Sequence, residues 1–292
     1  MKTGQIIEGR GGLYTVAEDN GDIWVLRAMN KLRRANMTPL VGDRVRFTPG
    51  SGEEHGWLTD ILPRTSYCLR PPVANIDLLC LTVAPTPQPD WLLVDKVLLF
   101  ARMQHIIPLL VVNKCDLSED AYQDAQRMYA KANLPVLRVS AQTGQGMDML
   151  HQAMQGHLCC FAGQSGVGKS RLISQLLGIE LVSQSISEKI ERGKQTTRHT
   201  SLLTGHGLRV LDTPGFSLLE TPELMEPSEL PPLYPEFVPY QGQCRFLTCL
   251  HNQEPGCAVV EAEQAGLLDA DRMARYRQLL STIQTNWRER YD

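Results

Sequence analysis

The segment GQSGVGKS at residues 163–170 has the residue types and spacing of a phosphate-binding loop. It follows an apolar run, LCCFA, and precedes SRLISQLLG, whose apolar residues have helical spacing. Glycines allow backbone N–H groups to surround phosphate oxygens, and a helix N-terminus favours negative charge. A glycine-rich turn without a ligand is the alternative, disfavoured because strand and helix are both in place. The residues assigned to phosphate binding are Gly163, Gln164, Ser165, Gly166, Val167, Gly168, Lys169, Ser170 and Arg171.

Two side chains of this loop have specific expected roles. The Lys169 ammonium should reach the β- and γ-phosphates, and the Ser170 hydroxyl should ligate Mg²⁺. A second strand, LRVLDTPG at 208–215, ends in Asp212, which is placed to hold the Mg²⁺ shell through water. The Gly215 N–H is expected to sense the γ-phosphate. DTPG alone fits any turn at a strand end, but beside a phosphate loop it favours a nucleotide-hydrolysing site.

The base specificity is predicted by NKCD at residues 113–116, which follows the apolar run LLVV. Guanine presents two adjacent donors, N1–H and N2–H, and the Asp116 carboxylate accepts both. Adenine has an acceptor at N1 and would leave the carboxylate unpaired, which disfavours an ATPase. Asn113 should fix the base and the loop, and the stem of Lys114 should cover the ring, with Cys115 completing the segment.

A second guanine-binding segment, SAQTG, begins at Ser140, and the backbone of Ser140 and Ala141 is expected to donate to the guanine O6. Both guanine motifs precede the phosphate loop, whereas an ordinary GTPase has NKxD well after it. This permuted order of motifs is compatible with a single nucleotide site, because loops at the carboxyl edge of a parallel sheet converge on one crevice. The order does lead DTPG almost directly into the C-terminal region. We therefore hypothesise that a γ-phosphate-dependent switch acts on that region.

The C-terminal region contains a cluster of soft metal ligands, Cys244, Cys249, His251 and Cys257. Three thiolates and an imidazole suit tetrahedral Zn²⁺, and a site filled by four protein ligands is structural. Three buried thiols and a surface histidine are the alternative, and the spacing differs from that of the common ribbon with two CxxC pairs. Three other cysteines, Cys80, Cys159 and Cys160, lie within apolar strand-like runs and are expected to be buried thiols.

The pattern of elements predicts three domains, at residues 1–68, 69–222 and 223–292. In the first, LYTVAED and DIWVLRA flank the hairpin signal DNGD, and further short strands follow, which indicates a small OB-like β-barrel. The barrel has either an RNA-binding or a scaffolding role. Its basic stretch KLRR, 31–34, is either an RNA contact or a solvated face.

The other two domains differ in their periodicity. In the second, buried strands such as IDLLCLTVA and IPLLVVN alternate with helical stretches, one of them opening at a capping Ser118, which predicts a parallel α/β sheet with helices on both faces. The third begins with a Pro-rich connection and ends in LLDADRMARYRQLLSTIQTNW, which has helical spacing. We expect this zinc-binding domain to be mostly helical.

Bulk properties exclude several classes. The 292 residues carry a net charge of −3, so a polyanion must be bound through local patches. The N-terminus MKTGQIIEGR has no signal-peptide core, and no apolar run reaches membrane-spanning length. We expect a soluble, cytoplasmic monomer without a membrane partner.

The order of these motifs, from the small β-barrel through NKxD, SAxTGxG, GQSGVGKS, paired threonines and DTPGF to the Cys/His cluster, resembles the RsgA family, also called YjeQ or YloQ. The resemblance covers essentially the whole chain. It implies an OB domain, a circularly permuted GTPase core and a zinc domain. It further implies late maturation of the small (30S) ribosomal subunit, contact with its rRNA, and hydrolysis of Mg²⁺-bound GTP that is slow alone and faster on the subunit.

The sequence departs from the usual GTPase or family pattern at two positions. The position after DTPG that is glutamine in many GTPases is Phe216, as expected for this family, and it cannot orient water. In the first switch, Gln195 stands where relatives have histidine, while Thr197 matches the threonine expected to ligate Mg²⁺. Gln195 or His199 is the candidate for the missing catalytic group, and either could instead be a solvated residue or an RNA contact.

Three functions fit the sequence. The first is a ribosome-assembly GTPase, catalysing attack of water on the γ-phosphate, with Lys169, Ser170, Thr197 and Asp212 in the catalytic machinery. The second is a GTP-gated RNA-binding module with negligible hydrolysis. The third is a signalling switch acting on a protein, which the barrel and the metal cluster disfavour.

Overall fold

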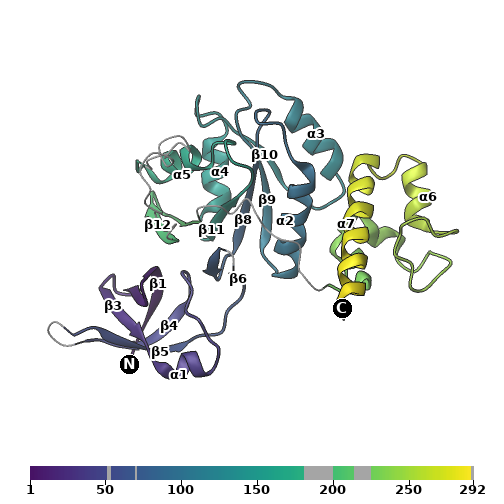
Figure 1. Cartoon of the computed structure of the whole chain (residues 1–292). Helices are drawn as coiled ribbons and strands as arrows, with labels where there is room; N and C mark the ends of the chain where they lie inside the picture. The colour runs from purple at the N-terminus through teal and green to yellow at the C-terminus, as the bar shows by residue number, and fades with distance from the viewer. Residues whose placement is uncertain (51–53, 70, 181–199, 214–224, 291–292) are drawn as a thin grey trace, which may run out of the picture.

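The chain is seen in a computed structural model that describes residues 1–50, 54–69, 71–180, 200–213 and 225–290 (Figure 1). An N-terminal barrel, a central sheet flanked by helices and a C-terminal helical unit follow one another along the chain. Within this described part, no helix is both long enough and apolar enough to cross a membrane.

The N-terminal unit is a closed five-stranded barrel in which the pairing runs β1-β2-β3-β5-β4 and back to β1. Alternate side chains point inward, so Ile6, Val16, Leu26, Phe47 and Leu58 are fully buried. The elements of this unit are β1 (Lys2–Arg10), β2 (Leu13–Glu18), β3 (Ile23–Ala28), α1 (Asn30–Arg34), β4 (Arg44–Thr48) and β5 (Gly56–Ile61). The OB-like barrel is confirmed, although strand β1 was not among the strands that the sequence predicted.

A short hairpin, β6 (Tyr67–Leu69) and β7 (Pro72–Ala74), connects the barrel to the central sheet. The central sheet has the strand order β10-β9-β8-β11-β13-β12. Its strands are β8 (Leu78–Val83), β9 (Ile107–Val112), β10 (Val136–Arg138), β11 (Leu158–Ala162), β12 (Ser201–Gly205) and β13 (Leu208–Asp212). Among these described strands of the central sheet, β12 alone runs antiparallel to the others, beside β13. The sequence predicted a purely parallel sheet, and this part of the prediction was wrong.

Helices cover both faces of this sheet, as the continuous apolar runs predicted. Alternate residues of β8 point to opposite faces: Leu79 and Leu81 pack with α2 and α3, whereas Leu78 and Cys80 pack with α4 and α5. The helices are α2 (Trp91–Met103), α3 (Asp120–Tyr129), α4 (Met147–Met154) and α5 (Lys169–Leu177). Helix α3 begins two residues after Ser118, whose Oγ accepts the Asp120 N–H rather than capping as predicted.

The barrel and the central sheet are joined by backbone pairing. Strand β1 pairs antiparallel with β12, Glu8 lying opposite Ser201. The described strands of both units therefore form one continuous sheet of eleven strands.

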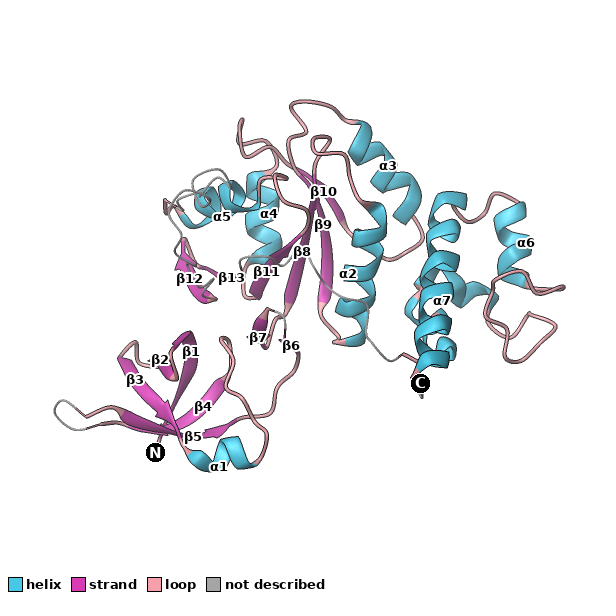
Figure 2. Ribbon diagram, in the orientation of Figure 1, coloured by secondary structure: helices cyan, strands magenta, loops and turns pink. Residues whose placement is uncertain are grey.

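The C-terminal unit packs against α2 and α3 (Figure 2). Three stacked or edge-on aromatic rings, Tyr234, Phe237 and Tyr276, form its core, and Leu99 of α2 packs into the same core. Its elements are the 3₁₀ turns η2 (Pro227–Glu229), η3 (Pro231–Leu233) and η4 (Pro235–Tyr240), and the helices α6 (Ala258–Gln264) and α7 (Ala270–Glu289). The predicted terminal helix is confirmed as α7, whereas α6 was not predicted.

Candidate functional site

The phosphate-binding loop connects β11 to α5, and two of its glycines have no room for a side chain. Gly163 has φ +135°, and a Cβ there would lie 2.1 Å from the Thr82 carbonyl oxygen. Gly168 has φ +97°, and a Cβ there would lie 2.4 Å from Asn113 Nδ2. Any other residue at either position would displace the neighbouring strand ends, so these contacts require the glycine spacing of the motif.

Lys169, the first residue of α5, curls back over the loop. Its Nζ donates to the carbonyl oxygens of Gly163 and Gln164, at 2.6 and 2.8 Å. Ser170 and Arg171 follow on the exposed first turn of the helix. Burial lowers the pKa of Lys169 to about 8. A polyphosphate beside the ammonium would reverse this shift, because an opposite charge favours the protonated form.

This pKa predicts a pH dependence of GTP affinity. Above pH 8 the lysine of the free protein is mostly neutral, and binding must recover a proton, so GTP affinity should fall about threefold from pH 7.5 to 8.5. Calorimetry at pH 8.5, in two buffers of different ionisation enthalpy, should detect uptake of about 0.8 proton per GTP. Zero uptake at pH 8.5 would show that Lys169 is already charged in the free protein.

The guanine-recognition segment is tied directly to the phosphate loop. Asn113 Nδ2 donates to the Val167 carbonyl at 2.8 Å, and its Oδ1 accepts the Ala141 N–H at 3.2 Å. Lys114 Nζ donates to the carbonyls of Thr86 and Gly166, at 2.6 and 2.7 Å. The structure thus brings NKCD and the phosphate loop together despite their order along the chain.

Asp116 lies exposed at the carboxyl end of β9, and Ser140 orients it. Ser140 Oγ donates to Asp116 Oδ1 and accepts the N–H groups of Gln142 and Thr143, at 3.2 and 3.1 Å. Cys115 is buried between these segments, and burial raises the pKa of its thiol. With one carboxylate oxygen held by Ser140, the planar carboxylate has a fixed direction for pairing with a base.

Asp212 ends β13, which pairs with β11, so DTPG starts at the edge where the phosphate loop starts. Burial raises the pKa of the Asp212 carboxyl, and a divalent cation beside it would lower that pKa again. Cys160 Sγ, in the middle of β11, lies 3.3 Å from Oγ1 of Thr213, the residue after β13, a contact that the sequence did not predict. The other predicted residues of the switch segments lie outside the described residues: Gln195, Thr197, His199, Gly215 and Phe216.

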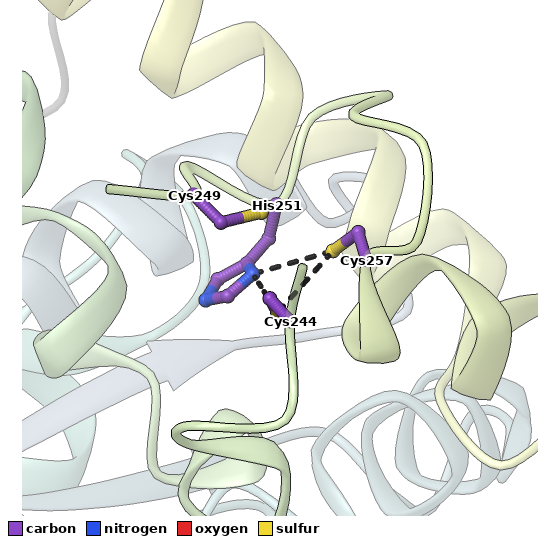
Figure 3. Close-up of side chains that lie close together, drawn as sticks. All are labelled: Cys244, Cys249, His251 and Cys257. Atoms are coloured by element: carbon purple, nitrogen blue, oxygen red, sulfur yellow. Dashed lines mark hydrogen bonds between the residues drawn. The ribbon is translucent and has the colours of Figure 1, made fainter. Parts of the chain in front are cut away.

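The four predicted metal ligands point toward one another (Figure 3). Their ligand atoms all lie within 4.8 Å of each other. Cys244 Sγ is 3.9 Å from Cys257 Sγ and 3.6 Å from His251 Nδ1, which is 3.4 Å from Cys257 Sγ. Ligands 2.3 Å from a tetrahedral ion are separated by about 3.8 Å, so the cluster has the size and donor set of a metal site.

Burial shifts the pKa values of the side chains in this cluster. Burial raises the pKa of Cys249 to about 12 and that of Cys257 in the same direction. Buried thiols without a cation therefore stay protonated, whereas a coordinated metal deprotonates them outright. Burial lowers the pKa of His251, which keeps the imidazole neutral and able to coordinate.

The described site joins a glycine-rich phosphate loop to a guanine-recognition motif that precedes it in the chain. This arrangement lies on an α/β sheet preceded by a barrel and followed by a Cys/His cluster. The fold and the site together define a circularly permuted GTPase.

Two family models match consecutive parts of the chain, the barrel and the central sheet. The RsgA N-terminal domain matches residues 3–58, and the RsgA GTPase matches residues 61–222. The chain belongs to the RsgA GTPase family.

Individual relatives match over nearly the whole length. A small ribosomal subunit biogenesis GTPase RsgA from Ruminiclostridium cellulolyticum is 40% identical, with 97% of this chain and 94% of the relative covered. One of the same name from a Geobacillus species is 38% identical, with 97% and 98% covered. The crystal structures of YjeQ from Thermotoga maritima and of YloQ, a circularly permuted GTPase, match with TM-scores of 0.80 and 0.78 and identities of 29% and 30%. The first match covers 97% of this chain and 98% of YjeQ, and the second 98% and 96% of YloQ.

Proposed function

We propose that this chain is a GTPase that binds the small (30S) ribosomal subunit and assists its late maturation, hydrolysing GTP slowly alone and faster on the subunit. The observation that carries the proposal is the pair of hydrogen bonds from Asn113 and Lys114 to the phosphate loop, since they make one site from two motifs. The names of the full-length relatives support the ribosomal partner.

In this site each chain residue has a defined task. The phosphate-loop amides and Lys169 hold the β- and γ-phosphates and offset the charge that develops there. Asp116 pairs with guanine, while Asn113 and Lys114 keep the base pocket against the phosphate loop. Mg²⁺, when bound, neutralises charge between the β- and γ-phosphates.

The proposed Mg²⁺ ligands come from two parts of the chain. Ser170 on the exposed first turn of α5 fits the role of direct ligand, and the half-buried carboxylate of Asp212 fits that of an outer ligand. The resemblance adds Thr197 as the second direct ligand, with Gln195 or His199 as the group that orients water.

The proposed cofactor of the C-terminal unit is one structural Zn²⁺ per chain. Three thiolates and an imidazole with tetrahedral spacing favour Zn²⁺ over Mg²⁺ or Ca²⁺, which prefer oxygen ligands. The four ligands Cys244, Cys249, His251 and Cys257 would fill its coordination shell and hold the loops before α6.

We place the RNA-binding surface on the barrel, at a groove of about 640 Å³. Trp57, 49% exposed, lines this groove together with Tyr14 and the exposed Arg27. Aromatic rings stack on unpaired bases, and arginine pairs with phosphates. Lys31 of the KLRR stretch instead forms an ion pair with Asp60 at 2.8 Å, so this stretch is the weaker candidate.

The same proposal divides the chain into three domains, at residues 1–68, 69–222 and 223–292. The proposal also places the protein in the cytoplasm, with the small ribosomal subunit as its partner, and takes it to act as a monomer.

The test measures GTP hydrolysis by the purified protein alone, with isolated small subunits and with isolated large subunits, at one moderate salt concentration. Stimulation of at least about tenfold by the small subunit and none by the large one is expected. Tight GTP-dependent binding without stimulated hydrolysis would favour the gated RNA-binding module instead. Neither binding nor stimulation would overturn the ribosomal partner.

A further inference from the structure

A cluster of buried charges joins the C-terminal unit to the GTPase sheet. Asp95 of α2 is fully buried, and its Oδ1 accepts hydrogen bonds from the Tyr129 hydroxyl, at 2.6 Å, and from the Arg272 guanidinium. Its Oδ2 accepts from Arg275 Nε at 2.6 Å. Arg272 also donates to Glu236 Oε1 at 2.9 Å. The two carboxylates and two guanidinium groups of this joint pair their charges in a geometrically demanding arrangement, and Arg102 of α2 interacts with them electrostatically.

The N-terminus of α2, five residues before Asp95, is tied to the phosphate loop. Gln164, the second residue of the loop, accepts the Asp90 N–H at 2.9 Å through Oε1 and donates to the Gln88 carbonyl at 3.2 Å through Nε2. The Asp90 carboxylate in turn caps α2 by accepting the Leu93 N–H at 2.9 Å. Helix α2 therefore contacts the phosphate loop through its N-cap and the C-terminal unit through its second turn.

Helix α7 extends this connection to the metal cluster. Arg272 and Arg275 face α2, and the next residues along the helix hold the ligand loop. The Tyr276 hydroxyl donates to the Leu250 carbonyl, and Arg277 Nε donates to the Asn252 carbonyl at 3.0 Å. Leu250 and Asn252 flank His251, so one helix fixes both the joint and the cluster. Figure 2 shows α7 against α2, with α6 on its far side.

We propose that Asp95 and Arg275 are positioning residues: through α2 and Gln164 they couple the C-terminal unit to the γ-phosphate site, and stimulation of hydrolysis by the small subunit depends on this coupling. The inference rests on the proposed function and adds a route of contacts from the C-terminal unit to the phosphate loop. This route is distinct from the connection through DTPG along the chain, because every contact in it lies outside the switch segments.

The test changes Arg275, since removing Asp95 would leave buried guanidinium groups uncompensated and unfold the joint. In Arg275→Met the aliphatic stem stays and Asp95 keeps Arg272 and Tyr129. Basal hydrolysis and GTP affinity should stay within about twofold of wild type, while stimulation by small subunits falls at least about tenfold. Arg275→Lys, which keeps a charged donor for Asp95, should recover most of the stimulation. Lys96→Met, one residue from Asp95 on the same helix, is the matched control and should be stimulated like wild type.

A double-mutant cycle separates a route from two independent defects. Gln164→Met removes both side-chain hydrogen bonds between the phosphate loop and the N-terminus of α2, and its stimulation is compared with its own basal rate. If the Gln164 and Arg275 contacts belong to one route, the double variant loses no more stimulation than the worse single variant. A double variant whose loss of stimulation is the product of the two single losses would overturn the route. Arg275→Met would also overturn it by losing basal and stimulated rates equally, because such a loss marks a merely structural role. Absence of stimulation in wild type would instead overturn the proposed function.

Discussion

Asp116→Asn should lower GTP affinity at least about hundredfold and abolish the preference for GTP over other purine triphosphates. The asparagine amide offers one acceptor and one donor, so its N–H₂ faces a guanine N–H and one hydrogen bond becomes a repulsive contact. Xanthine has a carbonyl at C2 in place of the amino group, so the variant should bind xanthosine triphosphate better than GTP. Equilibrium binding of the fluorescent derivatives of each nucleotide measures both changes.

Two controls show whether a change in nucleotide selectivity comes from the loss of the Asp116 carboxylate itself. Asp120→Asn makes the same substitution on the exposed first turn of α3, and it should leave nucleotide selectivity unchanged. The thermal unfolding midpoint of Asp116→Asn should match that of wild type, since Asp116 is exposed and Ser140 can donate to the amide oxygen. An Asp116→Asn protein that retains full GTP preference would refute the assignment of Asp116 to the base.

Loss of the proposed Zn²⁺ should unfold the loop that carries its four ligands. Structural Zn²⁺ contributes about 10–16 kcal/mol to folding in small zinc domains, and of residues 244–257, which carry the four ligands, only Cys257 is buried in the hydrophobic core of this unit. Cys249→Ser should therefore reduce the zinc content from one equivalent per chain to about zero. It should also make the segment around residues 244–257 exchange its amide hydrogens rapidly. Elemental analysis and hydrogen exchange measure these outcomes.

The specificity of the metal result depends on a second cysteine variant. Cys159→Ser changes a buried thiol of β11 on the opposite face of the central sheet, and it should retain one zinc equivalent. Nucleotide binding by Cys249→Ser should persist, because none of the phosphate-loop contacts reaches the cluster directly. A Cys249→Ser protein with full zinc content would contradict the four-ligand site.

Local patterns were enough to predict the parts of the fold that local physics determines. Strands such as Leu78–Val83 are buried on both faces and read as unbroken apolar runs. Strands β1 and β12 escaped prediction because part of their pairing is with strands far away in the chain: Gly4 lies opposite Val45 of β4, and Ser201 lies opposite Glu8. Their own residues, KTGQIIEGR and SLLTG, have weak alternation.

The same distinction holds for the site. Motif residues such as Asn113 and Lys169 were predictable because their chemistry fixes their spacing, and the structure brings their loops together. The Gln164–Asp90 and Asp95–Arg272 contacts join residues far apart in sequence, of types that are usually solvated, and no local pattern marks them. Long-range polar pairs of this kind depend on the tertiary arrangement alone.

The pairing of β1 with β12 has a consequence for experiments on shortened chains. Without the barrel, β12 would become an outer strand whose free N–H and C=O groups, beginning at Ser201, can recruit a strand from another molecule. A fragment that starts after the barrel is thus expected to self-associate, and its loss of activity would be mistaken for loss of an RNA contact. Point variants in the barrel groove keep the strand covered and avoid this artefact.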